Sequence, residues 1–242
     1  RTMSTHIMDS AIYGNAWNSA EMREIFDERA RLQGWLDILA ALAEAQAELG
    51  IIPAEAAPEI RRVCNIELLD MEALQRGYAE TGHSTLGLIR ELQKLCTGNA
   101  GEWIYYGATV QDLTDTHTAL ALLKVWAIVL RDLRQIESDL LALAVRHRIT
   151  PMAGRTHGQP GLPISFGYKV AVWVSEIRRH IERLKQIRER LGEGQLAGGV
   201  GSLSSYGKQG LALQERFLSK LGLRAPVISW LTARDTQVEF AN

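Results

Sequence analysis

The most regular hydrophobic pattern in the chain lies between Gln111 and Arg148, a stretch without proline or glycine. Apolar residues recur there every three or four positions, which is the spacing of one face of an α-helix. The apolar positions are Leu120, Leu123, Trp126, Leu130, Leu133, Ile136, Leu140 and Ala144. The pattern predicts one continuous helix, which would measure roughly 55 Å at about 1.5 Å per residue.

A second periodic stretch covers residues 163–191 and carries a similarly wide apolar stripe. Its apolar positions are Ile164, Tyr168, Ala171, Val174, Ile177, Ile181, Leu184, Ile187 and Leu191. The connection between the two long helices has roughly fifteen residues, a length that favours antiparallel packing in a bundle. The segment that follows, residues 192–210, contains seven glycines and is predicted to be a flexible or tightly turning loop.

Shorter periodic segments occupy the first part of the chain. We expect one helix from Ala20 to Leu49, with Asn18 as its N-cap and Gly50 after its end. Further helices are expected at about 54–63, 67–79, 84–96 and 210–221, with an irregular stretch at 97–110 and another helix beginning after Thr232. Strand signals are scarce, so the predicted fold class is all-α.

Composition and charge restrict the classes of protein without identifying one. The 242 residues carry a formal net charge of −1, which gives no electrostatic argument for nucleic-acid binding. Charges such as Lys124 and Arg131 interrupt the apolar stretches, so we expect no membrane span. Residues 1–6 lack an apolar signal segment, and Cys64 and Cys96 fit a reducing compartment. A soluble cytoplasmic protein is therefore expected.

A group of polar residues, Gly154–Pro160, lies between the two long helices and contains His157. An imidazole titrates near neutral pH, and Thr156 and Gln159 add uncharged hydrogen-bond donors. Because this group directly precedes a long helix, we expect backbone N–H groups there to favour a bound carboxylate. The alternative is that His157 and Gln159 only stabilise a tight loop.

A second polar group, Tyr106–Asp112, lies at the start of the first long helix. Thr109 or Asp112 is typical of a helix cap, whereas in the functional interpretation Thr109 binds a substrate carboxylate and Asp112 orients a histidine. A third group, Thr81–Thr85, contains His83 and by itself is more typical of a cap than of a site. Because a long helix separates the first two groups, a site formed from both has to be shared between subunits.

Several segments, in the right order, resemble the fumarase/aspartase superfamily, on the branch that holds adenylosuccinate lyase and 3-carboxy-cis,cis-muconate cycloisomerase. The resemblance runs from about Met22 to Asn242. Its segments are Met22–Phe26, Arg31–Leu36, Ala45–Pro53, Tyr106–Asp112, Gly154–Pro160, Gly198–Ser202 and Trp230–Asp235. It implies a small helical domain over residues 1–107 and part of a central bundle of long helices over residues 108–242.

The resemblance also implies a reaction and a set of site residues. The family reaction is an anti elimination that cleaves a C–N bond of a succinyl-type dicarboxylate and releases fumarate. Carried over residue by residue, the catalytic residues would be His157 and His83. The substrate-binding residues would be Thr109, Gln111, Asp112, Arg155, Thr156, Gln159, Ser202 and Arg234. A homotetramer with shared sites and a small dicarboxylate substrate is implied, and we expect no metal and no cofactor.

The sequence departs from the family pattern at several positions. Val110 replaces a serine and so removes a hydroxyl donor, and Ile12 stands where adenylosuccinate lyases have an arginine that helps to hold a phosphate. Bacterial muconate cycloisomerases tend to have tryptophan at the position of His157. The histidine in this sequence therefore favours elimination over ring closure. The family's mobile loop with the catalytic serine is not found. We therefore expect an incomplete and inactive portion of a lyase, with a cycloisomerase or a non-catalytic helical assembly module as alternatives.

Overall fold

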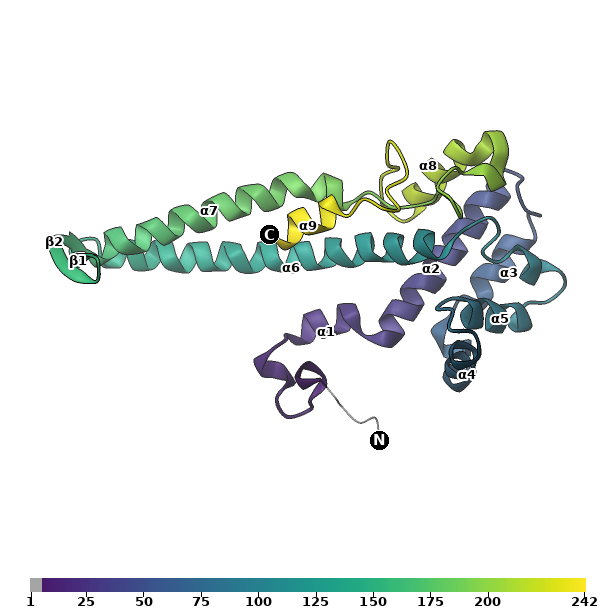
Figure 1. Cartoon of the computed structure of the whole chain (residues 1–242), viewed down its shortest axis with the longest axis horizontal. Coiled ribbons are helices and arrows are strands. Elements are labelled where there is room, and N and C mark those ends of the chain that lie inside the picture. Colours follow the sequence, from purple (N-terminus) through teal and green to yellow (C-terminus); the bar gives the residue numbers. More distant parts are fainter. Residues whose placement is uncertain (1–5) are drawn as a thin grey trace. The chain divides into compact units, whose positions relative to one another are not determined.

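The computed structural model describes residues 6–242 (Figure 1). Residues 1–5, which belong to the segment predicted to lack an apolar signal, lie outside the described residues. The α-helices are α1 (Ala20–Phe26), α2 (Glu28–Glu48), α3 (Ala56–Val63), α4 (Met71–Thr81), α5 (Leu86–Leu95), α6 (Val110–Arg146), α7 (Phe166–Leu191), α8 (Gly210–Lys220) and α9 (Asp235–Ala241). The two strands are β1 (Pro151–Thr156) and β2 (Gln159–Ser165). The all-α fold class is confirmed, with one small hairpin that the sequence did not predict.

Contacts divide the chain into two compact units. The first comprises Arg1–Leu122 and Gly192–Arg234, and the second comprises Leu123–Leu191 and Asp235–Asn242. Helix α6 contributes its first turns to one unit and its remainder to the other. This division does not follow the boundary after residue 107 that the family resemblance implies, and that boundary stays a prediction.

The core of the first unit is built on α2. Leu36 and Leu39 of this helix are at most 2% exposed, and Ile60 of α3 and Phe217 of α8 are equally buried. Helix α2 contacts both α3 and α8. A leucine, isoleucine or phenylalanine side chain contributes roughly 1.5–3 kcal/mol when it is fully buried. The apolar stripe that predicts this helix is therefore also the surface that holds the unit together.

The single helix expected over residues 20–49 is in fact two helices, so this prediction was wrong. Asp27 has an extended ψ of 144°, and its carboxylate accepts hydrogen bonds from two backbone N–H groups at the start of α2. The aspartate therefore ends α1 and caps α2, because a capping side chain satisfies N–H groups that have no partner inside the helix. The N-cap of α1 is Ser19 rather than Asn18, and its hydroxyl accepts from the Met22 N–H at 3.2 Å.

In the second unit, α7 runs antiparallel to the later part of α6 (Figure 1). The Trp126 indole N–H donates to the Leu184 carbonyl at 2.6 Å, and Glu137 forms an ion pair with Arg178. A residue further along α6 therefore contacts a residue earlier in α7, as expected for antiparallel helices. Helix α9 contacts α7 in the same unit. The predicted antiparallel pair of long helices is confirmed.

Strands β1 and β2 form an antiparallel hairpin between α6 and α7, which the sequence analysis missed (Figure 1). Thr156 pairs with Gln159, so the turn consists of His157 and Gly158, whose φ angles are 49° and 74°. Positive φ at both central residues defines a type I′ turn, whose twist matches that of paired strands. The segment escaped prediction because prolines and glycines, which are depleted in strands, recur throughout it.

The helices of the second unit leave several apolar side chains exposed. On α6, Ile136, Leu141 and Val145 are 44%, 51% and 59% exposed, and on α7 Tyr168 and Val172 are 63% and 52% exposed. Contiguous exposed apolar surface is unusual on a soluble monomer and commonly marks an interaction surface. Of these residues, Ile136 and Tyr168 belong to the apolar stripes predicted for the two helices, and the other three lie outside those stripes.

Helix α6 is also long and apolar enough to cross a membrane, judged by length and composition alone. The mean hydropathy of its 18-residue window is 1.3. This finding corrects the expectation that charged residues interrupt every candidate span. A single helix of this kind is weak evidence for a membrane protein, because a core helix of a soluble protein passes the same test.

Asp112 fixes the start of α6 in the first unit. The residue is 2% exposed, and its carboxylate accepts backbone hydrogen bonds from Thr109 at 2.9 Å, Ala197 at 2.7 Å and Gly198 at 3.0 Å. The bond from Thr109 is one half of a capping box, since Thr109 directly precedes α6 and Asp112 is the third residue of the helix. The other two bonds join α6 to the glycine-rich segment 192–210.

Replacement of Asp112 by asparagine should destabilise the first unit by about 1–3 kcal/mol. The amide NH₂ would face a backbone N–H donor, so at least one buried donor would lose its acceptor. Chemical denaturation followed by circular dichroism measures the change. The matched control is Asp132→Asn on the same helix, because Asp132 is 56% exposed and pairs with the adjacent Arg131. Equal unfolding midpoints for Asp112→Asn and the control would contradict the prediction.

Candidate functional site

The loop before α6 is held by side chains from two other parts of the first unit. The Tyr106 carbonyl accepts hydrogen bonds from Gln46 Nε2 at 2.8 Å and from the Tyr206 hydroxyl at 3.0 Å. Gly107 has φ 72°, and a Cβ there would lie 2.6 Å from the Tyr206 ring, so the position requires glycine. Burial raises the pKa of the Tyr206 hydroxyl, which keeps it protonated as a donor. These contacts fix the backbone that leads to Thr109.

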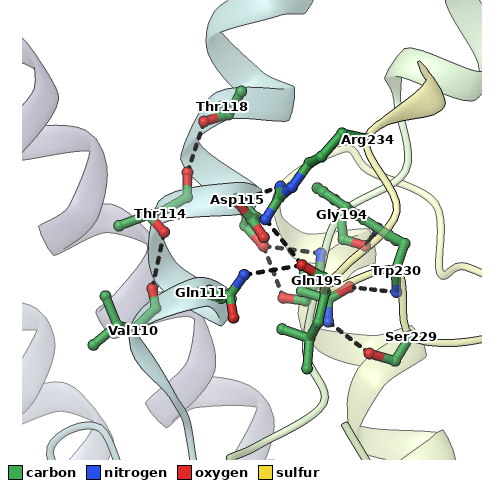
Figure 2. Close-up of polar contacts among 12 residues, drawn as sticks. Val110, Gln111, Thr114, Asp115, Thr118, Gly194, Gln195, Ser229, Trp230 and Arg234 are labelled. Carbon is green, nitrogen blue, oxygen red and sulfur yellow. Dashed lines mark hydrogen bonds and ion pairs between the residues drawn. The ribbon is translucent and has the colours of Figure 1, made fainter. Parts of the chain in front are cut away.

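Figure 2 shows a polar network between the first turns of α6 and the segment 229–234. Gln111 Nε2 donates to the Leu231 carbonyl at 2.9 Å, and Arg234 Nη2 donates to the same carbonyl at 3.0 Å. Arg234 Nη1 also donates to Asp115 Oδ1 at 2.9 Å. Two of the residues that the family resemblance singles out, Gln111 and Arg234, are therefore joined through one peptide group.

A second part of the network lies deeper in the first unit. The Thr116 hydroxyl donates to the Gln195 carbonyl at 2.7 Å and accepts from the Gln195 N–H at 2.9 Å. The Gln195 side chain donates to the Ser229 hydroxyl at 3.0 Å and accepts from the Trp230 N–H at 3.2 Å. Gln195 and Thr116 are both fully buried. This chain of bonds attaches the segment 229–234 to α6 without using any residue of the predicted site.

Asp112 has a structural role that accounts for both of its carboxylate oxygens. Burial raises the pKa of this carboxyl. The hydrogen bonds donated by three backbone N–H groups act in the opposite direction and lower the pKa. The capping interpretation of Asp112 is therefore the one that the structure supports. Its expected role in orienting a histidine stays a prediction. Thr109, which is half-buried, is held through its own N–H and leaves its side chain to other partners.

Sequence reasoning missed Asp115, Thr116 and Gln195. Asp115 follows Gln111 by four positions, which places both on one face of α6. A run of polar residues at the start of an otherwise apolar helix was the available signal. Their partners could not be read from the sequence, since Gln195 is 79 residues from Thr116.

His83 lies just before α5, and its Nδ1 accepts a hydrogen bond from the Leu86 N–H at 3.1 Å. The ring therefore caps α5, as the cap interpretation of Thr81–Thr85 expects. Because Nδ1 accepts, a neutral ring carries its proton on Nε2. The residue also lines a cavity of about 600 Å³ between α2, α4 and α5, together with Trp35 and Tyr78. His83 can offer this cavity a hydrogen-bond donor, and its catalytic role stays a prediction.

The polar group around His157 lies on the hairpin of the second unit. Arg155 and Thr156 end β1, Gln159 begins β2, and His157 occupies the turn. All four side chains are exposed. The expectation that His157 lies beside a helix N-terminus was wrong, because β2 separates it from the first residue of α7, Phe166. From this chain's second unit, an anion bound there would contact the hairpin's side chains rather than the first turn of α7.

Ser202 lies in the glycine-rich segment and is exposed. The N–H of Gly201 donates to the Gly198 carbonyl at 3.1 Å, and both glycines have positive φ, so a tight turn immediately precedes the serine. The substrate-binding role expected for Ser202 stays a prediction. Within residues 6–242, no group of three or more histidine, cysteine, aspartate or glutamate side chains is arranged to hold a metal ion.

The structure sorts the predicted site residues into separate groups. Gln111 and Arg234 share one network in the first unit, and Thr109 and Asp112 lie in the adjoining turn of α6. His83 lies elsewhere in the same unit, at the start of α5. The hairpin group belongs to the second unit.

Comparison with known proteins gives a consistent result. A family described as lyase matches residues 16–242. N-acetyl-S-(2-succino)cysteine lyase from Enterococcus italicus is 42% identical over 240 residues, which cover 99% of this chain and 52% of that protein. Adenylosuccinate lyase from Methanothermobacter thermautotrophicus is 43% identical over 226 residues, which cover 93% of this chain and 50% of that protein.

A solved structure supports the same assignment. The 3-carboxy-cis,cis-muconate lactonizing enzyme from Pseudomonas putida has a TM-score of 0.90 and 35% identity, over 96% of this chain and 53% of that chain. The chain spans about half the length of the curated relatives it matches. The resemblance read from the polar groups and their order is confirmed. The chain belongs to the lyase family, within the fumarase/aspartase superfamily.

Proposed function

We propose that the full-length protein containing this sequence is a lyase that eliminates fumarate from a succinyl-type dicarboxylate. The observation that carries the proposal is the 42% identity to N-acetyl-S-(2-succino)cysteine lyase across 99% of this chain. Similarity to an adenylosuccinate lyase across 93% of the chain supports the same reaction class. Cleavage of a C–S bond and cleavage of a C–N bond are one elimination with different leaving atoms.

The chemistry of this elimination defines what the site has to supply. A base removes a proton from the carbon next to one carboxylate, and that electron pair forms the C=C bond as the C–S or C–N bond breaks. The leaving sulfur or nitrogen keeps the bonding pair and takes up a proton, so the products are fumarate and a thiol or an amine. Negative charge accumulates on the carboxylate beside the deprotonated carbon, so hydrogen-bond donors have to face it.

The residues of this chain fit such a site as donors. Thr109 lies at the N-terminus of α6, where the helix dipole favours an anion, and Arg234 adds a cation in the same unit. We assign carboxylate binding to these groups and to the exposed Arg155 and Thr156. The imidazole of His157 would donate the proton to the leaving atom. This chain supplies no assignment for the base.

The same proposal includes assembly into a homotetramer with shared sites. Helix α6 is unbroken over its 37 residues, and it separates Thr109 from His157 along the chain. A helix of that length measures about 55 Å, so the two groups can serve one reaction when different subunits supply them. The exposed apolar residues of α6 and α7 support burial against further copies of the chain. A cytoplasmic location stays a prediction.

A second candidate function is ring closure of a 3-carboxymuconate-type substrate. The TM-score of 0.90 to the lactonizing enzyme favours it. Elimination needs a leaving heteroatom, whereas lactonization needs a carboxylate that adds to a double bond, so the products distinguish the two reactions.

Ultraviolet absorbance of the full-length protein with defined substrates tests the proposal. N-acetyl-S-(2-succino)cysteine, or a succinylated amine, should give the low-wavelength absorbance of fumarate at a rate above that of a no-enzyme control. Lactone formation from 3-carboxy-cis,cis-muconate without fumarate release would establish the cycloisomerase instead. Absence of both activities would favour a non-catalytic helical assembly module.

Replacement of His157 by alanine in the full-length protein should lower kcat at least about a hundredfold, which is the scale of a general acid contribution. The matched control is His180→Ala, because the His180 side chain is 44% exposed on α7 and its acidic partner is Glu176 on the same helix. Steady-state rates of fumarate release give the comparison. Wild-type rates for the His157 variant would remove this residue from the mechanism.

Subunit mixing tests whether sites are shared. Thr109→Ala and His157→Ala proteins, each impaired alone, should regain part of the activity when their subunits are mixed, because some hybrid sites contain neither substitution. Native mass spectrometry confirms that hybrids form. Hybrids without any recovered activity, over a range of mixing ratios, would argue that each chain builds its own site.

A further inference from the structure

Arg234 is held on three sides by groups of the first unit (Figure 2). Asp115 Oδ1 accepts from Nη1 at 2.9 Å, the Leu231 carbonyl accepts from Nη2 at 3.0 Å, and the guanidinium lies 5.5 Å from the centre of the Trp230 ring. The side chain is nevertheless 43% exposed. The two hydrogen bonds use two of the five guanidinium donors, which leaves the others free for a ligand.

The Asp115 side chain is more buried than is usual for a residue in a surface ion pair. Its side chain is 10% exposed, and its second oxygen, Oδ2, is buried without a hydrogen-bond partner in the described residues. A buried carboxylate is costly unless it is paired, and a structural pair with arginine is commonly bidentate. Here the contact with Arg234 is through one oxygen only. The contact therefore orients the guanidinium without covering its remaining edge.

The pair is not needed to attach the segment 229–234 to α6. Gln195 already binds both the Ser229 hydroxyl and the Trp230 N–H, and it is tied to α6 through Thr116. The Trp230 indole N–H adds a bond to the Gly194 carbonyl at 2.9 Å. Loss of the Asp115 contact would therefore release the guanidinium while the segment itself stays in place.

We propose that Asp115 is a positioning residue, which holds the Arg234 guanidinium in the orientation that binds a substrate carboxylate. The inference rests on the proposed function insofar as the ligand is a dicarboxylate. Asp115 contacts no substrate itself and acts only through Arg234. The negative charge of Asp115 also weakens the attraction of Arg234 for a substrate carboxylate. The gain in affinity from an oriented guanidinium therefore has to exceed this loss.

Succinate binding to the full-length protein, measured by calorimetry, tests this role without requiring turnover. Asp115→Asn keeps the shape and one acceptor but removes the charge that strengthens the hydrogen bond. We expect the Kd for succinate to rise roughly five- to tenfold, as for loss of charge assistance in one bond. With Arg234→Gln as the background, the same substitution should change the Kd less than about twofold, because no guanidinium remains to be positioned.

The matched control is Glu137→Gln, which removes a carboxylate from an ion pair with Arg178 elsewhere on α6 and should leave the Kd unchanged. Equal losses in both backgrounds would show a general structural effect and overturn the proposal, as would no change in the Kd on Asp115→Asn. The same coupling in a protein that releases no fumarate would sustain the positioning role while the proposed function fails. If the unsubstituted protein does not bind succinate, the inference falls.

Where fumarate release is observed, the same variant gives a second readout. Loss of positioning in the ground-state complex should raise KM by the same factor as the Kd and change kcat less than about threefold. A fall in kcat with an unchanged KM would contradict the proposal, because it would place Asp115 in the chemical step rather than in substrate binding.

Discussion

The polar architecture of the first unit depends on one buried carboxylate, that of Asp112. A charged group is stable in such a place only when hydrogen bonds replace its hydration, and here three backbone N–H groups do so. Because these donors come from the turn before α6 and from the glycine-rich segment, the carboxylate sets where the helix begins. Helix geometry then fixes the positions of Gln111, Asp115 and Thr116. The hydrogen bond from Arg234 to Asp115 in turn fixes the position of Arg234.

The sequence predicted the parts of the fold that depend on apolar periodicity. Helices α6 and α7 were foreseen because their apolar stripes extend over many turns, and α6 contains no proline or glycine. Asp27 was not recognised as a break, because the apolar spacing continues on both sides of it and only its capping bonds separate α1 from α2. The hairpin was missed because its stability lies in strand pairing and a type I′ turn, neither of which produces an alternating apolar pattern.

The sequence predicted which types of residue form the candidate site, but it did not predict which other residues they contact. The polar groups containing Thr109 and His157 were recognised because hydroxyl, amide and imidazole groups cluster there. What these residues touch depends on distant parts of the chain: Asp112 binds Ala197, 85 residues away, and Arg234 binds Asp115, 119 residues away. Local sequence patterns do not predict such long-range contacts, so nothing distinguished Asp115 from other polar residues at the start of a helix.

The two-residue turn at His157 makes chain length as important as residue identity. Next to the turn, Thr156 pairs with Gln159 and Arg155 with Pro160, and the register shifts between Ala153 and Arg155. The turn therefore fixes which residues of β2 lie opposite Arg155 and Thr156. A single residue inserted into the turn or deleted from it would shift β2 against β1 and change which residues lie opposite Arg155 and Thr156. Divergence within the hairpin should therefore proceed by exchange of side chains at constant length, which keeps the pairing of β1 with β2.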